Sequence, residues 1–151
     1  MRAVWQVECG GRPFQSDGSL TRRFEPHHMP GATIGWRDSL KIGTAEREQL
    51  FLEAYDADPD AALRATSWGG PQIMGFNAAA AGFSDAAGMV AAMSDREIAH
   101  LDAFLAFVVS KRLVAALRAR DWRAFAKVYN GSGQVAFYAV RMQNAYRGFV
   151  A

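Results

Sequence analysis

The sequence predicts an α+β fold that is mostly α, with a small β region near its N-terminus. From residue 45 onward, apolar residues recur at helical spacing. Residues 12–40 are instead rich in Gly, Pro, Ser and Asp, and they contain Asp17-Gly18, a strong signal for a tight hairpin. The chain has 151 residues, enough to bury an ordinary core, so we expect residues 1–151 to form a single domain.

Composition restricts the class of protein. Half of the residues are hydrophobic and 21% are charged, which is typical of a globular chain and excludes a disordered one. The formal net charge is +2 without long basic runs, so we expect no nucleic-acid partner. No apolar run approaches the roughly 20 residues that a membrane helix needs, so we expect no stable membrane insertion. The single cysteine, Cys9, excludes an internal disulfide and is expected to be a small buried residue.

The N-terminal elements are predicted to be short. Residues 1–9 indicate the end of a helix, because apolar residues follow a helical period and Gly10-Gly11 then ends it. We expect residues 12–40 to form an irregular hairpin or a three-stranded patch with long loops around Asp17-Gly18.

Two helices are predicted in the middle of the chain. The first runs from Glu46 to Tyr55. The second has Asp58 as its N-cap and Pro59 in its first turn, and is expected to end near Ser67. Gly69-Gly70-Pro71 follows as a helix break, with Pro71 able to open the next helix.

The C-terminal half predicts further helices. Ser84-Asp85 begins a helix that runs through Met93, and Ser94 to Glu97 resembles a capping box for the next one. That next helix can extend through Leu113 and Leu117, and its predicted core stripe is Ile98, Leu101, Phe104, Leu105 and Val108.

Two helices complete the prediction. Asp121 caps a helix that turns Trp122, Phe125, Ala126 and Tyr129 inward and ends at Asn130-Gly131. A last helix spans residues 135–149, and its expected apolar residues are Phe137, Tyr138, Val140, Met142 and Tyr146.

Glu8 is the first candidate catalytic residue. It ends an apolar helical run beside Trp5 and Val7, where the helix dipole disfavours negative charge. The dipole and the apolar neighbours should both raise the pKa of its carboxyl, as a general acid at neutral pH requires. The alternative is a solvated glutamate at a helix end.

Glu25 is the second candidate, and it follows Phe24 across the predicted hairpin. A paired carboxylate could act as a nucleophile, activate water or stabilise an oxocarbenium-like centre. The alternative is a strand-edge charge paired with Arg22 or Arg23. His27-His28 supplies too few ligands for a zinc site, so we expect no metal. One of these histidines is expected to bind Glu25 or to line a cleft.

Two further segments carry side chains that suit a sugar. In the segment from Ser67 to Asn77, the amides of Gln72 and Asn77 offer donors and acceptors, and Trp68 offers a stacking face. Tyr129 and Asn130 could direct a hydroxyl and an amide into a cleft. The alternatives are a packed interhelical turn for the first segment and a helix C-cap for the second.

In this order the segments resemble the N-acetylmuramidase domain family of phage endolysins, a branch of the lysozyme-like superfamily. The resemblance covers residues 4–147. It rests on Val7-Glu8 with Gly10-Gly11, Asp17-Gly18, Phe24-Glu25 with His27, Ala62-Leu63-Arg64, Ser67-Trp68-Gly69, Gln72 to Asn77, Asp121-Trp122, Phe125-Ala126 and Tyr129-Asn130-Gly131.

The resemblance implies a lysozyme-like fold, in which a helical lobe and a small β-hairpin lobe flank a glycan cleft. It implies a muramidase that cleaves the β-1,4 bond between N-acetylmuramic acid and N-acetylglucosamine without a cofactor. Glu8 would be the catalytic acid and Glu25 the second carboxylate. The substrate-binding residues would be Ser67, Trp68, Gln72, Asn77, Tyr129, Asn130 and His27.

Two other functions are left open by the sequence. One is a lytic transglycosylase that uses Glu8 alone, and the other is a non-catalytic module that binds the cell wall. The N-terminus does not resemble a secretory signal, so we expect synthesis in the cytoplasm and release to the periplasm with the help of a holin. The expected partner is the peptidoglycan glycan strand, and the expected oligomeric state is a monomer.

Overall fold

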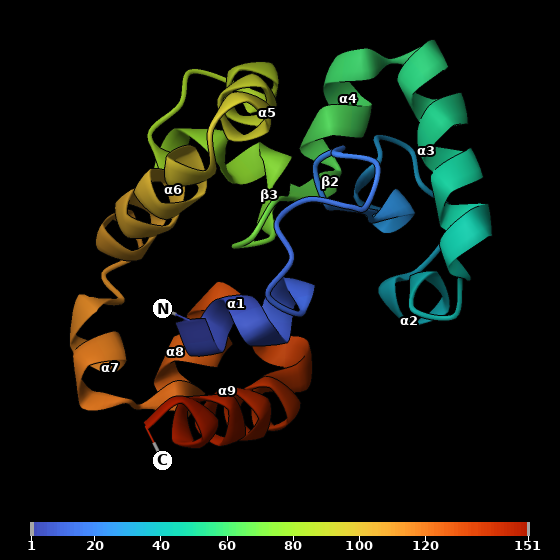
Figure 1. The fold of residues 1–151 in the computed structure, drawn as a ribbon. Coiled ribbons are helices and arrows are strands. Elements are labelled where there is room, and N and C mark those ends of the chain that lie inside the picture. The colour runs from blue at the N-terminus through green and yellow to red at the C-terminus, as the bar shows by residue number, and fades with distance from the viewer. Residues whose placement is uncertain (1, 151) are drawn as a thin grey trace.

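The computed structural model describes residues 2–150, which form a mostly helical molecule with one small sheet (Figure 1). Short 3-10 helices are labelled η. The elements in chain order are α1 (Arg2–Cys9), β1 (Arg22–Phe24), η1 (Pro26–His28), α2 (Trp36–Ser39), α3 (Thr44–Ala57), α4 (Pro59–Arg64), β2 (Thr66–Trp68), β3 (Ile73–Met74), η2 (Gly75–Ala81), α5 (Ala86–Asp95), α6 (Glu97–Ser110), α7 (Val114–Ala119), α8 (Trp122–Tyr129), η3 (Ser132–Gln134) and α9 (Val135–Val150).

The sheet is antiparallel in the order β1-β2-β3, and Phe24 pairs with Thr66 while Ser67 pairs with Met74. The prediction of a β patch within residues 12–40 was therefore only partly right. That region supplies β1 and the isolated bridge between Phe14 and Leu20, whereas the other two strands come from the segment after α4.

The predicted helix from Pro59 to near Ser67 was wrong at its end. It stops at Arg64, because Thr66 to Trp68 pairs with β1 and becomes fully buried. Pairing in the folded chain thus overrides the local helical pattern. Pro71 accordingly lies in the β2–β3 turn and does not open a helix.

Several predicted helix boundaries are confirmed by their caps. The carboxylates of Asp58, Asp85 and Asp121 each accept a hydrogen bond from a backbone N–H in the first turn of the helix that follows. Gly10 and Gly11 both have positive φ and end α1, as expected.

Three predictions in the C-terminal half were wrong. The capping box at Ser94 does not form, because α5 continues to Asp95 and the N-cap of α6 is Arg96, without a side-chain bond. Helix α6 ends at Ser110 instead of continuing, since Arg112 takes a positive φ. Ile98 and Leu105 of the predicted core stripe are 53% and 48% exposed, because α6 buries a narrower face than the sequence suggested.

The core consists of two hydrophobic clusters. The first lies around the sheet and includes Phe24, Phe51, Trp68, Met89 and Phe107. The second packs α1, α6, α8 and α9 together, and its central side chains are Val4, Phe104, Phe125 and Met142. Tyr129 packs against both clusters.

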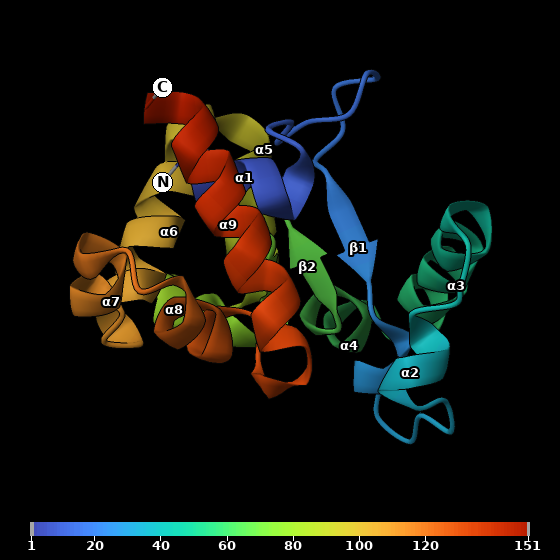
Figure 2. The same ribbon diagram turned by 90° about the horizontal axis from the view of Figure 1, so that it is seen from below.

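The sheet lies between two groups of helices. Figure 2 shows α2 and α3 on one side of β1, and α1, α8 and α9 on the other. Helix α9 packs along both α1 and α8. None of the described helices is long and apolar enough to cross a membrane.

Gly75 is predicted to be intolerant of a side chain. A Cβ atom there would lie 2.1 Å from the Leu63 carbonyl oxygen, so Gly75→Ala should lower the free energy of unfolding by about 1–3 kcal/mol, measured by urea denaturation. Gly148→Ala is the control, because nothing lies within 4 Å of that position and alanine favours the helix. Equal stability of the two variants would contradict this packing.

Candidate active site

Glu8 lies in the last turn of α1 and is partly buried, with one hydrogen bond to its carboxyl. The Asn130 side-chain amide at the end of α8 donates to Glu8 Oε1 at 2.8 Å. Burial raises the pKa of Glu8 to about 7, although this hydrogen bond and the positive charge of Arg141 both act to lower it. The predicted upward shift is confirmed, and burial is its main cause.

Glu25 follows β1 directly, and its carboxylate accepts hydrogen bonds from several side chains. Arg23 Nε donates to Oε1 at 2.6 Å, and Ser39 Oγ on α2 donates to Oε2 at 3.1 Å. Of the two pairings in the alternative interpretation of Glu25, the one with Arg23 forms, whereas Arg22 pairs with Glu48 of α3. Glu25 thus lies in a network of cationic and hydroxyl donors.

Arg47 is a site residue that the sequence did not reveal. Its side chain on α3 is 7% exposed and donates to the Phe24 carbonyl at 2.6 Å and to the Ser39 carbonyl at 2.5 Å. It also approaches Glu25 Oε2 at 3.4 Å. A buried guanidinium satisfied in this way fixes β1 and α2 around the Glu25 carboxylate.

The two histidines lie beside Glu25 without binding it tightly. His27 Nδ1 is 3.7 Å from Glu25 Oε2, which is too far for a hydrogen bond. The ring centroids of His27 and His28 are 4.1 Å apart. Burial and the neighbouring His27 lower the pKa of His28. Within residues 2–150, no three His, Cys, Asp or Glu side chains gather closely enough to hold a metal ion.

Ser67 and Gln72 hold the β2–β3 turn together. Ser67 Oγ donates to Gln72 Oε1 at 2.8 Å, and Gln72 Nε2 donates to the carbonyls of Gly69 at 2.8 Å and Thr21 at 3.3 Å. These bonds accompany an uncommon backbone conformation, because Gln72 has a φ of 50° without being glycine. Both side chains serve the shape of the turn.

His100 holds the same turn from α6. Its ring is fully buried, and its Nδ1 accepts the Gly70 N–H at 2.9 Å while its Nε2 lies 2.8 Å from the Met93 carbonyl. Burial lowers the pKa of His100, which favours the neutral ring that this pair of bonds requires. Gly69 must lack a side chain, because a Cβ there would lie 2.5 Å from the His100 ring.

The structure contradicts the proposed stacking role of Trp68. Its side chain is 3% exposed, belongs to the first hydrophobic cluster and donates its indole N–H to the Leu63 carbonyl. Its face is therefore covered by protein. Asn77, by contrast, is partly buried on η2 and forms no hydrogen bond to either glutamate.

Tyr129 and Asn130 lie at the end of α8, where the sequence placed them. The Tyr129 hydroxyl donates to the Pro71 carbonyl at 2.7 Å, and burial holds its pKa well above the usual range. Its hydroxyl therefore fixes α8 against the β2–β3 turn, and Asn130 is left as the residue of this pair that reaches Glu8.

Tyr138 on α9 is influenced by the charges of both glutamates. This α9 side chain is partly buried, and the negative charges of both Glu8 and Glu25 contribute to the upward shift of its pKa, after burial itself. Both negative charges therefore act on the Tyr138 hydroxyl. Arg141, on the same helix, acts on Glu8 and Tyr138.

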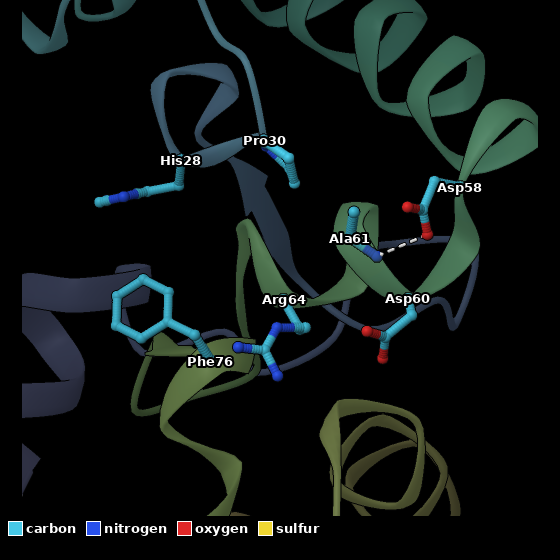
Figure 3. Close-up of a pocket in the computed structure, with 7 residues that line it drawn as sticks. All are labelled: His28, Pro30, Asp58, Asp60, Ala61, Arg64 and Phe76. Atoms are coloured by element: carbon cyan, nitrogen blue, oxygen red, sulfur yellow. Dashed lines mark hydrogen bonds between the residues drawn. The ribbon is translucent and has the colours of Figure 1, made fainter.

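A separate pocket of about 300 Å³ lies between η1, α4 and η2 (Figure 3). Its lining residues are His28, Pro30, Asp58, Asp60, Ala61, Arg64 and Phe76. Of the residues singled out from the sequence as site candidates, it contains only His28, and Asp58 is already engaged as the N-cap of α4.

Comparison with known proteins gives two findings. The family model described as N-acetylmuramidase matches residues 1–150. A crystal structure of the Burkholderia AP3 phage endolysin is similar to this chain, with a TM-score of 0.75 and 32% sequence identity, covering 99% of this chain and 63% of that one. This chain therefore spans a little under two thirds of the length of that endolysin chain. No curated protein matches the sequence.

The raised pKa of Glu8 predicts a pH-dependent stability. The folded chain binds this proton more tightly than the unfolded chain, since the pKa is about 7 against an ordinary 4.5. The stabilisation is complete below about pH 4.5, and about 3 kcal/mol of it is lost as the pH rises through 7. Glu8→Gln removes this titration. Its free energy of unfolding, compared with that of the parent, should therefore be higher at about pH 8 than at about pH 4.

Urea denaturation of both chains across this pH range tests the expectation. Glu53→Gln is the control, because Glu53 is exposed on α3 and should leave the pH profile of the parent unchanged. Parallel profiles for Glu8→Gln and the parent would show that Glu8 is not the titrating group.

Proposed function

The chain belongs to the N-acetylmuramidase family, and from this premise we propose that residues 1–151 act as a peptidoglycan hydrolase with Glu8 as its general acid. The proposed reaction cleaves the β-1,4 bond between N-acetylmuramic acid and N-acetylglucosamine. The observation that carries the proposal is a partly buried carboxyl in the last turn of α1, with a pKa of about 7 and a hydrogen bond from the Asn130 amide.

Glu8 supplies the proton in the proposed mechanism. At neutral pH a carboxyl with a pKa of about 7 is protonated in a large share of molecules and can protonate the leaving glycosidic oxygen. Asn130 holds the carboxyl in place through Oε1. The second carboxyl oxygen of Glu8, Oε2, would then face the bond to be cleaved.

Glu25 has the complementary role in the proposed mechanism. Its carboxylate would stabilise the positive charge that develops on the sugar or direct the attacking water. The bonds from Arg23 and Ser39 hold the carboxylate in a fixed orientation, as such a role needs. This second carboxylate favours hydrolysis over transglycosylation, which does not require it.

Substrate binding would rely on polar groups around Glu8. Asn130 Oδ1 is buried and has no partner among the described residues, so it can accept a hydrogen bond from a sugar hydroxyl or acetamido N–H. Ser67, Gln72 and Tyr129 would act by shaping the wall of the site. We retain Asn77 and His27 as proposed glycan contacts.

The likeness to the AP3 endolysin supports a role as a phage or prophage endolysin. In that role the chain would reach periplasmic peptidoglycan with the help of a holin and act as a monomer. Sedimentation of the purified chain and fractionation of expressing cells with and without a holin would test these points.

Removal of the proposed acid should abolish activity without unfolding the chain. We expect Glu8→Gln to reduce the release of reducing ends from purified sacculi at least 100-fold, because general acid catalysis contributes about 10²–10⁴ in rate. Glu53→Gln is the control, since Glu53 is exposed on α3. Parental rates in Glu8→Gln would refute the assignment, and 1,6-anhydro ends in the product masses would show a transglycosylase.

Activity should also decline as the pH rises above 7. The proton that Glu8 donates is lost as the pH passes its pKa of about 7, so kcat/KM should fall about tenfold for each further pH unit. The initial rate of reducing-end release between about pH 5 and pH 9 measures this. A rate that stays constant up to about pH 9 would argue against Glu8 as the acid.

A further inference from the structure

Trp36 is an exposed tryptophan whose environment the mechanism above does not use. Its side chain at the start of α2 is 44% exposed, whereas Trp68 and Trp122 are 3% and 5% exposed. Single exposed apolar residues are common on proteins, so exposure alone does not indicate a role. The position of Trp36 relative to the two glutamates is what distinguishes it.

On one side, α2 is fixed against Glu25. Ser39 Oγ donates to Glu25 Oε2 at 3.1 Å, and Arg47 Nη2 donates to the Ser39 carbonyl at 2.5 Å. Trp36 precedes Ser39 by one helical turn, so the two side chains lie on the same face of α2. Trp36 therefore projects from α2, the helix whose Ser39 binds Glu25; α2 and Glu25 together are called the Glu25 wall.

On the other side, the Trp36 ring reaches the segment that follows Asn130. The ring atoms Cη2 and Cζ3 face Gly133, where an added Cβ would lie 3.8 and 4.0 Å from them. Gly133 belongs to η3, directly after the α8 end whose Asn130 binds Glu8. Figure 2 shows α2 and the start of α9 at the same end of the molecule. The end of α8 with Asn130, together with Glu8, is called the Glu8 wall. Trp36 thus extends from the Glu25 wall to the segment that follows the Glu8 wall.

The contacts of the ring leave room for a ligand. Gly133 meets the edge of the six-membered ring, and the Arg37 guanidinium lies over the ring at 5.4 Å from its centroid. With 44% exposure, a large part of the Trp36 side chain is open to solvent beside these two contacts. An indole face of this kind offers a large apolar surface at low entropic cost.

We propose that Trp36 is the platform on which a sugar ring of the glycan strand stacks as the strand passes between Glu25 and Glu8. This inference rests on the proposed function and assigns to Trp36 the stacking role that the sequence suggested for Trp68. The residue binds substrate and takes no part in proton transfer, so its loss should act on KM more than on kcat.

The test measures binding apart from cleavage. In the Glu8→Gln background, soluble peptide-free glycan strands are titrated while tryptophan fluorescence and sedimentation are followed. We expect Trp36→Ala to weaken binding about tenfold and Trp36→Phe about threefold or less, because phenylalanine keeps an aromatic face. Val109→Ala is the matched control, since Val109 near the end of α6 is 64% exposed and lies outside the elements that carry Glu8, Glu25 and Trp36.

Fluorescence separates a binding role from a structural one. Strand binding should shift the emission of Glu8→Gln, and the shift should disappear in Glu8→Gln/Trp36→Phe, in which the other tryptophans remain. In the active chain, Trp36→Ala should raise KM about tenfold and change kcat less than threefold.

The outcomes distinguish the two proposals. A parent chain that releases reducing ends while Trp36→Ala binds strands as tightly as its background overturns the role of Trp36 alone. A parent chain that releases no sugar ends overturns the proposed function. If Trp36→Phe binds as weakly as Trp36→Ala, stacking on an aromatic face is refuted.

Discussion

The turn between β2 and β3 joins the strand that precedes Glu25 to the helices that pack around Glu8. Its backbone and side chains bond to Thr21 directly before β1, to α6 through His100 and to α8 through Tyr129. The His100 bond is possible only while Nδ1 carries no proton, and burial favours that state. The position of this turn therefore depends on a neutral, buried imidazole far along the chain from either glutamate.

Local signals made much of the fold predictable. Asp58 and Asp121 cap helices by bonds to backbone groups within the next turn, so the sequence alone contains the whole interaction. Strand β2 has no such local signal, because Thr66 to Trp68 becomes a strand only by pairing with residues far earlier in the chain. The helical pattern that precedes it was therefore extended too far.

The site was predictable to the extent that a residue's chemistry follows from its neighbours in sequence. Glu8 could be recognised from the apolar helix that it ends, and burial does raise its pKa. Arg47 could not, since a charged residue on an amphipathic helix usually faces solvent and only the fold shows its carbonyl partners. The sequence does not show that Trp36 is exposed whereas Trp68 is buried, because burial depends on how the chain folds.

Tyr129 has a consequence for the way the molecule loses its structure. Its ring stacks on Phe125 in the second hydrophobic cluster and packs on Phe107 in the first, while its hydroxyl is bonded to Pro71. One side chain thus shares apolar contacts with both halves of the core, and neither half can melt without exposing it. Heating should therefore give a single cooperative transition, in which the two halves of the core unfold together.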